Sequence, residues 1–152
     1  MKYLHGNYAG NSSLIFYGVL SVIAFGLNWI WEIGQMFAYA GEAGASRTKS
    51  FLFCTLAAVG DAIVTTAIYF FLKFLIKPNG AKFFLSAAIS GAVCAAGFEW
   101  FAVRFNLWAY GEQMIVLPVI GIGLLPFVQL TLLVPLAIWL TENSKAFNFR
   151  KL

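Results

Sequence analysis

Charged residues are scarce in this chain. Only 11% of its 152 residues are Asp, Glu, Lys or Arg, whereas 61% are hydrophobic. A water-soluble domain usually has about a quarter of its residues charged. The shortage argues against an ordinary soluble domain and indicates that lipid covers most of the surface. The net charge of +4 is therefore interpreted as a topology signal, and we expect no nucleic-acid partner.

Histidine and the common cofactor motifs are also missing. The single histidine, His5, lies in the N-terminal tail, which excludes His-rich di-iron sites, bis-His haem and His-rich zinc sites. There is no phosphate-binding Gly-rich loop, no Asp-rich diphosphate motif and no serine nucleophile elbow. Cys54 and Cys94 have no metal-ligand spacing and are expected to be small packing residues. We expect no metal and no cofactor, so any catalysis would be acid–base chemistry by carboxyl groups.

Long hydrophobic runs dominate what is present. About 20 apolar residues are needed to cross a bilayer as a helix. The runs are continuous, whereas the strands of a membrane barrel alternate between polar and apolar residues. The sequence predicts an all-α integral membrane protein, a bundle of four transmembrane helices in one domain over residues 1–152. The expected helices cover residues 13–40, 50–76, 83–110 and 114–141.

The basic residues predict the orientation. Seven are found at the N-terminus, near the second loop and at the C-terminus: Lys2, Lys73, Lys77, Lys82, Lys145, Arg150 and Lys151. Only Arg47, Lys49 and Arg104 fall on the opposite side. Because basic residues concentrate on the cytoplasmic side, both termini are expected in the cytoplasm. The expected location is a bacterial inner membrane or a plasma membrane.

Three acidic residues lie within the predicted spans. With a rise of about 1.5 Å per residue, Glu32 lies roughly 12 Å, Asp61 roughly 16 Å and Glu99 roughly 15 Å from the outer ends of their helices. An acid facing lipid at such a depth is costly, so all three are expected to face the interior. Because burial and neighbouring carboxyls disfavour charge, at least one should be protonated at neutral pH. These three are the candidate catalytic residues.

Other polar and aromatic residues lie near the acids. Glu32 shares one helical face with Asn28, Gln35 and Tyr39. The candidate ligand-binding residues are Asn28, Trp29, Trp31, Gln35, Trp100 and Gln129. An alternative is that the acids only bind helices together, with these amides and Arg104 as partners. Pro118 and Pro126 are expected to interrupt the hydrogen bonds of the fourth helix, which can then bend and open a cavity beside Gln129; an ordinary kinked membrane helix is the alternative.

A short pattern recurs near the ends of the first and third predicted helices. Residues 38–42 read Ala-Tyr-Ala-Gly-Glu and residues 109–112 read Ala-Tyr-Gly-Glu. A duplicated two-helix unit, related by an axis along the membrane normal, would leave such a pattern. Chance similarity in a biased composition is the alternative.

The run Asn28-Trp29-Ile30-Trp31-Glu32 resembles the Trp-Glu-containing helix of membrane-bound meroterpenoid (terpene) cyclases. In that family a membrane-embedded acid protonates an epoxide or olefin and starts cyclisation. The resemblance implies that Glu32 is the proton donor. The resemblance covers this run alone. Because the family is longer and has more spans, the family's second acid has no assigned position here.

Three functions remain open from the sequence. The first is binding of a lipophilic small molecule in an intramembrane acidic and aromatic pocket, with acid–base isomerisation or cyclisation of an isoprenoid-like lipid as the associated reaction. The second is a non-catalytic subunit of a larger membrane complex. The third is a small proton- or cation-coupled transporter, which would need a homo-oligomer to enclose a pathway. Membrane lipids are expected neighbours in every case.

Overall fold

The computed structural model describes residues 6–39, 47–76, 78 and 80–144. This part of the chain is mostly helical. Helix α1 covers Gly6–Gln35 and continues as the 3-10 turn η1, Met36–Ala38, while α2 covers Arg47–Leu75, α3 Ala81–Arg104 and α4 Leu124–Asn143. Within these residues four helices are long and apolar enough to cross a membrane, which confirms the prediction of four such helices. Outside the described residues lie the basic residues Lys2, Lys77, Lys145, Arg150 and Lys151.

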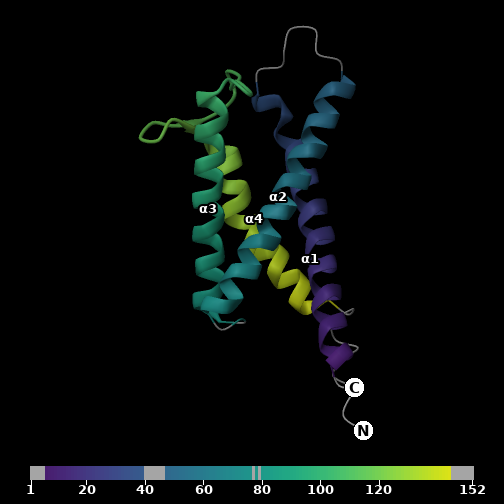
Figure 1. The fold of residues 1–152 in the computed structure, drawn as a ribbon. Helices are drawn as coiled ribbons and strands as arrows, with labels where there is room; N and C mark the ends of the chain where they lie inside the picture. The colour runs from purple at the N-terminus through teal and green to yellow at the C-terminus, as the bar shows by residue number, and fades with distance from the viewer. Residues whose placement is uncertain (1–5, 40–46, 77, 79, 145–152) are drawn as a thin grey trace.

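The helices form two antiparallel pairs. Helix α1 packs mainly on α2 and α3 mainly on α4, and α1 also packs on α4. Helices α2 and α3 touch much less, so the bundle is incompletely closed between them. In Figure 1 the start of α1 and the end of α4 lie at one end, which we call the terminal end. We call the opposite end, where α3 leads into residues 105–123, the hairpin end.

Small residues bring α3 and α4 together. Ala87, Gly91 and Ala95 recur every fourth residue on the buried face of α3. A Cβ added to Gly91 would lie 2.3 Å from the carbonyl oxygen of Leu130 on α4, so only glycine permits this backbone approach. Such small-residue stripes are the usual means of close packing between helices in lipid. Glu99 is the next buried residue along the same stripe.

The third helix ends earlier than predicted, at Arg104 instead of residue 110. Asn106 adopts a left-handed conformation with φ of 53°. The amide of Leu107 then donates to the carbonyl of Ala102 at 2.9 Å and satisfies one of the last helical carbonyls. This is the Schellman type of helix ending, in which asparagine is one of the few residues that tolerate positive φ.

The fourth helix begins ten residues later than predicted, at Leu124 instead of residue 114. Two short antiparallel strands, β1 (Val116–Leu117) and β2 (Ile122–Gly123), occupy the predicted first turns. Between them lie Pro118, which has no amide to donate, and Gly121, whose φ is 67°. The predicted kinks are therefore wrong. Pro118 lies in the hairpin turn and Pro126 in the first turn of α4, where amides have no helical partner anyway, whereas Pro135 is the proline inside the helix.

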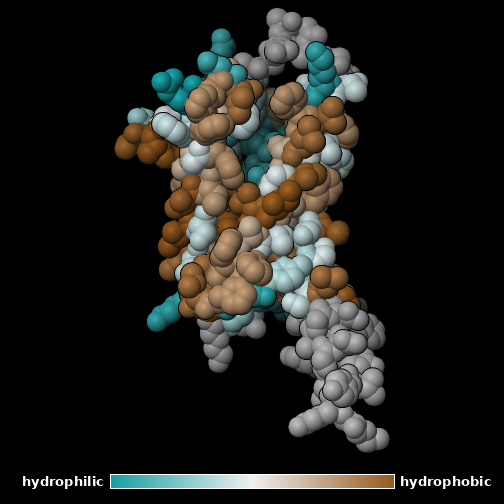
Figure 2. Space-filling model, viewed as in Figure 1, coloured by the Kyte–Doolittle hydropathy of each residue, from teal (hydrophilic) through white to brown (hydrophobic). Residues whose placement is uncertain are grey.

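The outside of the bundle is apolar along its length. Large exposed hydrophobic side chains occur on all four helices, as the brown areas of Figure 2 show on one face. Inside, the terminal end is filled by apolar and aromatic packing: Tyr69 stacks on Phe16 at 4.6 Å between ring centroids and meets Phe83 edge-on at 5.8 Å. The buried hydroxyls of Thr65 and Thr141 donate to carbonyls of their own helices. The other buried polar residues, Asn28, Gln35, Glu99 and Gln129, lie toward the hairpin end.

Candidate functional site

The face of α1 predicted to be polar does point into the bundle. Asn28 is fully buried and Gln35 is 3% exposed, while Glu32 between them is partly buried. Their spacing of four and three residues keeps all three on one side of the helix. The amide of Gln35 donates to Oε1 of Glu32 at 3.0 Å, so the stripe is internally connected.

Gln129 of α4 joins this stripe to α2. Its Nε2 lies 3.0 Å from Oδ1 of Asn28, 3.1 Å from Oε1 of Glu32 and 2.8 Å from Oδ2 of Asp61. Its Oε1 accepts a hydrogen bond from Gln35 at 2.9 Å. We call these five residues, Asn28, Glu32, Gln35, Asp61 and Gln129, the amide–acid network. All five were predicted from the sequence, and the structure brings them together around one buried amide.

The amide–acid network has more acceptors than donors. An amide nitrogen carries two protons, and three acceptor oxygens lie within reach of Nε2 of Gln129. Among the described residues no hydrogen bond reaches the second oxygen of Glu32 or of Asp61, and no Lys or Arg pairs with either acid. A proton on a carboxyl, or a donor brought by a ligand, would complete the network.

The three tryptophans predicted beside the acids take different positions. Trp31 donates its indole N–H to Oε1 of Gln35 at 3.1 Å and so borders the amide–acid network. Trp29 instead donates to Thr55 of α2 at 3.1 Å and fixes the α1–α2 pair. Trp100 is 58% exposed on the outside of α3. Trp29 and Trp100 therefore make no hydrogen bond to the amide–acid network, and their roles in ligand binding stay predictions.

Glu99 belongs to a second cluster, next to the amide–acid network. Its carboxyl accepts hydrogen bonds from the hydroxyl of Tyr110, from the hydroxyl of Tyr39 at 3.5 Å, and from Trp108. Glu99 is only 4% exposed. We call these four residues the Glu99 cluster. Arg104, weighed as a partner of the acids, is exposed at the end of α3 and takes no part in it.

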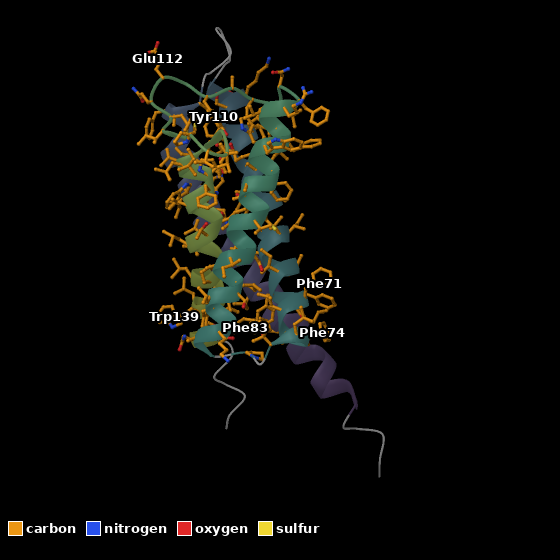
Figure 3. All side chains as sticks on the ribbon, turned by 90° about the vertical axis from the view of Figure 1, so that its left-hand side faces the viewer. Phe71, Phe74, Phe83, Tyr110, Glu112 and Trp139 are labelled. Carbon is orange, nitrogen blue, oxygen red and sulfur yellow. The ribbon has the colours of Figure 1, made fainter. Side chains whose placement is uncertain are left out.

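Tyr110 connects three parts of the fold. Besides donating to Glu99 on α3, its hydroxyl accepts the amide of Gly123 at the start of α4 at 2.8 Å. Tyr110 also pairs with Tyr39 as an isolated antiparallel bridge, and the amide of Gly111 donates to the carbonyl of Ala38 at 2.9 Å. In Figure 3 Tyr110 lies over the hairpin end, whereas Glu112 projects away from the bundle.

The two tyrosine hydroxyls keep their protons. Burial, with the hydrogen bond to Glu99, raises the pKa of Tyr110 above its usual range. Burial raises the pKa of Tyr39 still further, with contributions from the negative charge of Glu99 and then of Glu32. Both hydroxyls therefore serve as donors to Glu99 across the working pH range.

A hydrophilic recess opens near the hairpin end. Figure 2 shows it between the upper parts of α2 and α3, with hydrophilic residues at its floor and hydrophobic residues along its rim. Four residues of the amide–acid network and the Glu99 cluster are buried, namely Asn28, Gln35, Glu99 and Gln129, and the other members are partly buried or exposed. Among the residues that the structure describes, no group of three His, Cys, Asp or Glu side chains could hold a metal ion. The recess therefore offers carboxyl and amide groups as its chemistry.

Sequence reasoning missed the partners of Glu99. Tyr39, Trp108 and Tyr110 lie near the ends of the predicted helices, where aromatic residues are common at the membrane interface, so their positions do not single them out as partners of an acid. The repeated Ala-Tyr pattern, at Ala38-Tyr39 and Ala109-Tyr110, was the available signal, because these two tyrosines meet in the bridge. The duplication itself stays a prediction, although a pairing of equivalent residues is what a local two-fold axis would give.

Comparison with known proteins gives no relative from which a function of the site could be inferred. The chain matches no protein-family model, no curated protein and no solved structure. The structure is a mostly helical bundle that is apolar outside. Toward one end it holds two groups of polar side chains, each joined by its own hydrogen bonds.

Proposed function

We propose that this chain is an integral membrane protein that binds a lipophilic small molecule at the amide–acid network. One observation carries the proposal: a single buried amide, that of Gln129, is shared by carboxyls from two helices at the floor of a recess. The second carboxyl oxygens of Glu32 and Asp61 have no hydrogen-bond partner, yet they are not buried: the hydroxyl of Tyr17 is the only buried side-chain polar atom without a partner among the described residues. These two oxygens are therefore accessible to a ligand hydroxyl, amine or proton, which would supply the donors that the network lacks.

Glu32 is the residue we propose as the acid. Its Oε1 accepts from Gln35 and Gln129, which holds the carboxyl in place, while its other oxygen has no partner among the described residues. A carboxyl oriented in this way can deliver a proton to a bound olefin or epoxide. The resemblance of residues 28–32 to meroterpenoid cyclases supports this chemistry, with an isoprenoid-like lipid as the substrate. Asp61, which shares the amide of Gln129, is the partner that we propose takes up or returns the proton.

Native mass spectrometry of the protein, extracted mildly from its own membrane, tests the proposal. We expect a bound lipophile of a few hundred daltons on the wild-type protein. Glu32→Gln keeps the acceptor oxygen but removes the acid, so it should retain the fold and lose turnover of that lipophile. Glu112→Gln is the matched control, since Glu112 is an exposed acid in the hairpin. Partner chains without any small molecule would contradict the proposal and favour the subunit alternative.

The orientation is part of the same proposal. We propose that both termini face the cytoplasm of a bacterial cell or the cytoplasmic face of a plasma membrane, which places the recess in the outer half of the bilayer. The excess of basic residues at the termini and near residues 73–82 supports this. A C-terminal green fluorescent protein fusion should fluoresce, and a C-terminal alkaline phosphatase fusion should be inactive. The reverse pair of results would overturn the orientation without affecting the ligand proposal.

A further inference from the structure

We propose that the recess is entered sideways from the bilayer, between α2 and α3, by a lipid whose head group donates hydrogen bonds and carries no negative charge. This inference rests on the proposed function and adds to it the route and the class of ligand. It is argued from three observations: the packing of α2, the contacts that cross the hairpin end, and the charge of the recess.

The exposure of side chains along one face of α2 changes from one end of the helix to the other. Ala57, Asp61 and Thr65 follow at intervals of four residues and so share a face. Asp61 shows that this face is directed inward, because it contacts Gln129 of α4. Along it Ala57 is exposed, Asp61 is partly buried and Thr65 is completely buried. This stripe of α2 is therefore uncovered toward the hairpin end and covered toward the terminal end, whereas the neighbouring Cys54 and Ala58 are buried.

The arrangement of the helices explains this gradient. Helix α2 ends at Leu75 and α3 begins at Ala81, so the two helices are adjacent at the terminal end. From there they separate toward the hairpin end, as Figure 1 shows, and the recess of Figure 2 lies in the resulting gap. Exposed hydrophobic side chains, such as Leu56 on α2 and Val93 on α3, continue the apolar outer surface around it. A hydrocarbon chain in the gap would remain in surroundings like those of the bilayer.

Hydrogen bonds cross the hairpin end of the bundle, in contrast to the gap between α2 and α3. The Tyr39–Tyr110 bridge and the hydrogen bond from Gly111 to Ala38 join the end of α1 to the segment after α3. The hydroxyl of Tyr110 ties the same segment to Glu99 and to Gly123. These contacts close the hairpin end between α1 and the segment after α3, and none of them involves α2. Entry between α2 and α3 breaks none of the hydrogen bonds described.

The charge of the recess selects the head group. Glu32, Asp61 and Glu99 lie in the interior toward the hairpin end, and none of them pairs with a basic side chain among the described residues. A phosphate or carboxylate head group would meet only negative or neutral partners there. A hydroxyl or an ammonium group supplies the donors that the amide–acid network lacks and meets no repulsion. The ligand class is therefore a long-chain alcohol or amine, as opposed to an anionic lipid.

Photochemical labelling in lipid nanodiscs tests the inference. The probe is a twelve-carbon primary amine with a diazirine in the middle of its chain, and the reference probe is the alkyl phosphate of the same chain. Illumination converts the diazirine to a carbene with loss of N₂, and the carbene inserts into a nearby C–H bond. We expect the amine to label the gap-facing parts of α2 and α3 and the phosphate to label only the outer surface. Ala57→Phe should reduce this labelling several-fold, whereas Ala81→Phe, at an exposed alanine of α3, should not.

Each other outcome has a distinct meaning. Equal labelling of the gap by amine and phosphate would overturn the head-group selection. Labelling of the recess that Ala57→Phe leaves unchanged, or that is confined to residues 105–123, would overturn lateral entry while leaving ligand binding intact. If no recess residue is labelled and native mass spectrometry shows no lipophile, the proposed function itself fails. Circular dichroism of both variants verifies that they are folded.

Discussion

Glu32 and Glu99 are both withdrawn into the bundle, yet their surroundings differ in kind. Glu99 has donors from three aromatic side chains, Tyr39, Tyr110 and Trp108, and is almost fully buried. Glu32 shares amide protons with Asp61, and one oxygen of each of these carboxyls has no described partner. Burial alone therefore does not mark a functional acid. The supply of hydrogen-bond donors separates the carboxyl that holds the fold from the carboxyls available for chemistry.

The largest effect is expected from Glu99→Leu. It removes the common acceptor of the Glu99 cluster and leaves buried donors without partners, so the free energy of unfolding should fall by about 3 kcal/mol. Glu99→Gln keeps an acceptor oxygen and should cost less than about 1 kcal/mol. Unfolding by sodium dodecyl sulfate in mixed micelles measures both. If Glu99→Leu is as stable as the wild type, Glu99 has no structural role.

Gly91→Ala should be next, at about 2 kcal/mol of lost stability, because its Cβ would collide with the carbonyl of Leu130 and push α4 away. Leu130 follows Gln129, so the shift should disturb the amide–acid network and reduce ligand binding. Gly97→Ala is the matched control, since open space surrounds a Cβ there. It should be neutral or stabilising by up to about 1 kcal/mol. The same unfolding titration applies, and equal effects of the two variants would contradict the close approach of α3 to α4.

Two tyrosines on the same carboxyl give a finer comparison. Tyr110→Phe loses a donor to Glu99 and an acceptor for the amide of Gly123, and should cost about 1.5 kcal/mol. Tyr39→Phe loses only a contact of 3.5 Å, which is long for an O–H donor, and should cost less than about 0.5 kcal/mol. Thermal unfolding in detergent can rank them. The opposite ranking would show that Tyr110 is not the residue that secures the hairpin end.

Asp61→Asn is expected to change stability least and ligand binding most. The new amide adds donors to a network with surplus acceptors, so stability should stay within about 0.5 kcal/mol of wild type or rise slightly. Binding of the lipophile should nevertheless be lost, because the ligand's donor no longer finds a carboxyl. Native mass spectrometry and unfolding measurements on one sample check both parts. A strong loss of stability would place Asp61 with Glu99 among the structural acids.

The helices and the amide–acid network could be predicted because each depends on a local pattern. Apolar runs of about 20 residues mark helices, and polar residues inside them must turn inward. The spacing of Asn28, Glu32 and Gln35 therefore placed them together before any tertiary contact was known. Gln129 followed from the same reasoning, since it is a polar residue within the fourth apolar run.

The hairpin end could not be predicted in the same way. Residues 114–123 contain no charged residue and are as apolar as the helices, so hydropathy did not separate them from the fourth span. What ends α3 is the conformation of Asn106, and what shapes the turn before α4 is the pair Pro118 and Gly121. These are backbone effects of single residues. The donors of Glu99 were missed because they come from separate segments that meet only in three dimensions.

The division of the bundle into two helical pairs has a consequence for how the chain can be made. The connection between α2 and α3, across residues 76–80, contributes no part of the amide–acid network or of the Glu99 cluster. The contacts between the pairs come instead from side chains such as Gln35, Asp61 and Gln129, and from the backbone pairing of Tyr39 with Tyr110. Two half-chains, separated at this connection and expressed in the same cell, should each insert as a helical hairpin and reassemble into one complementing pair.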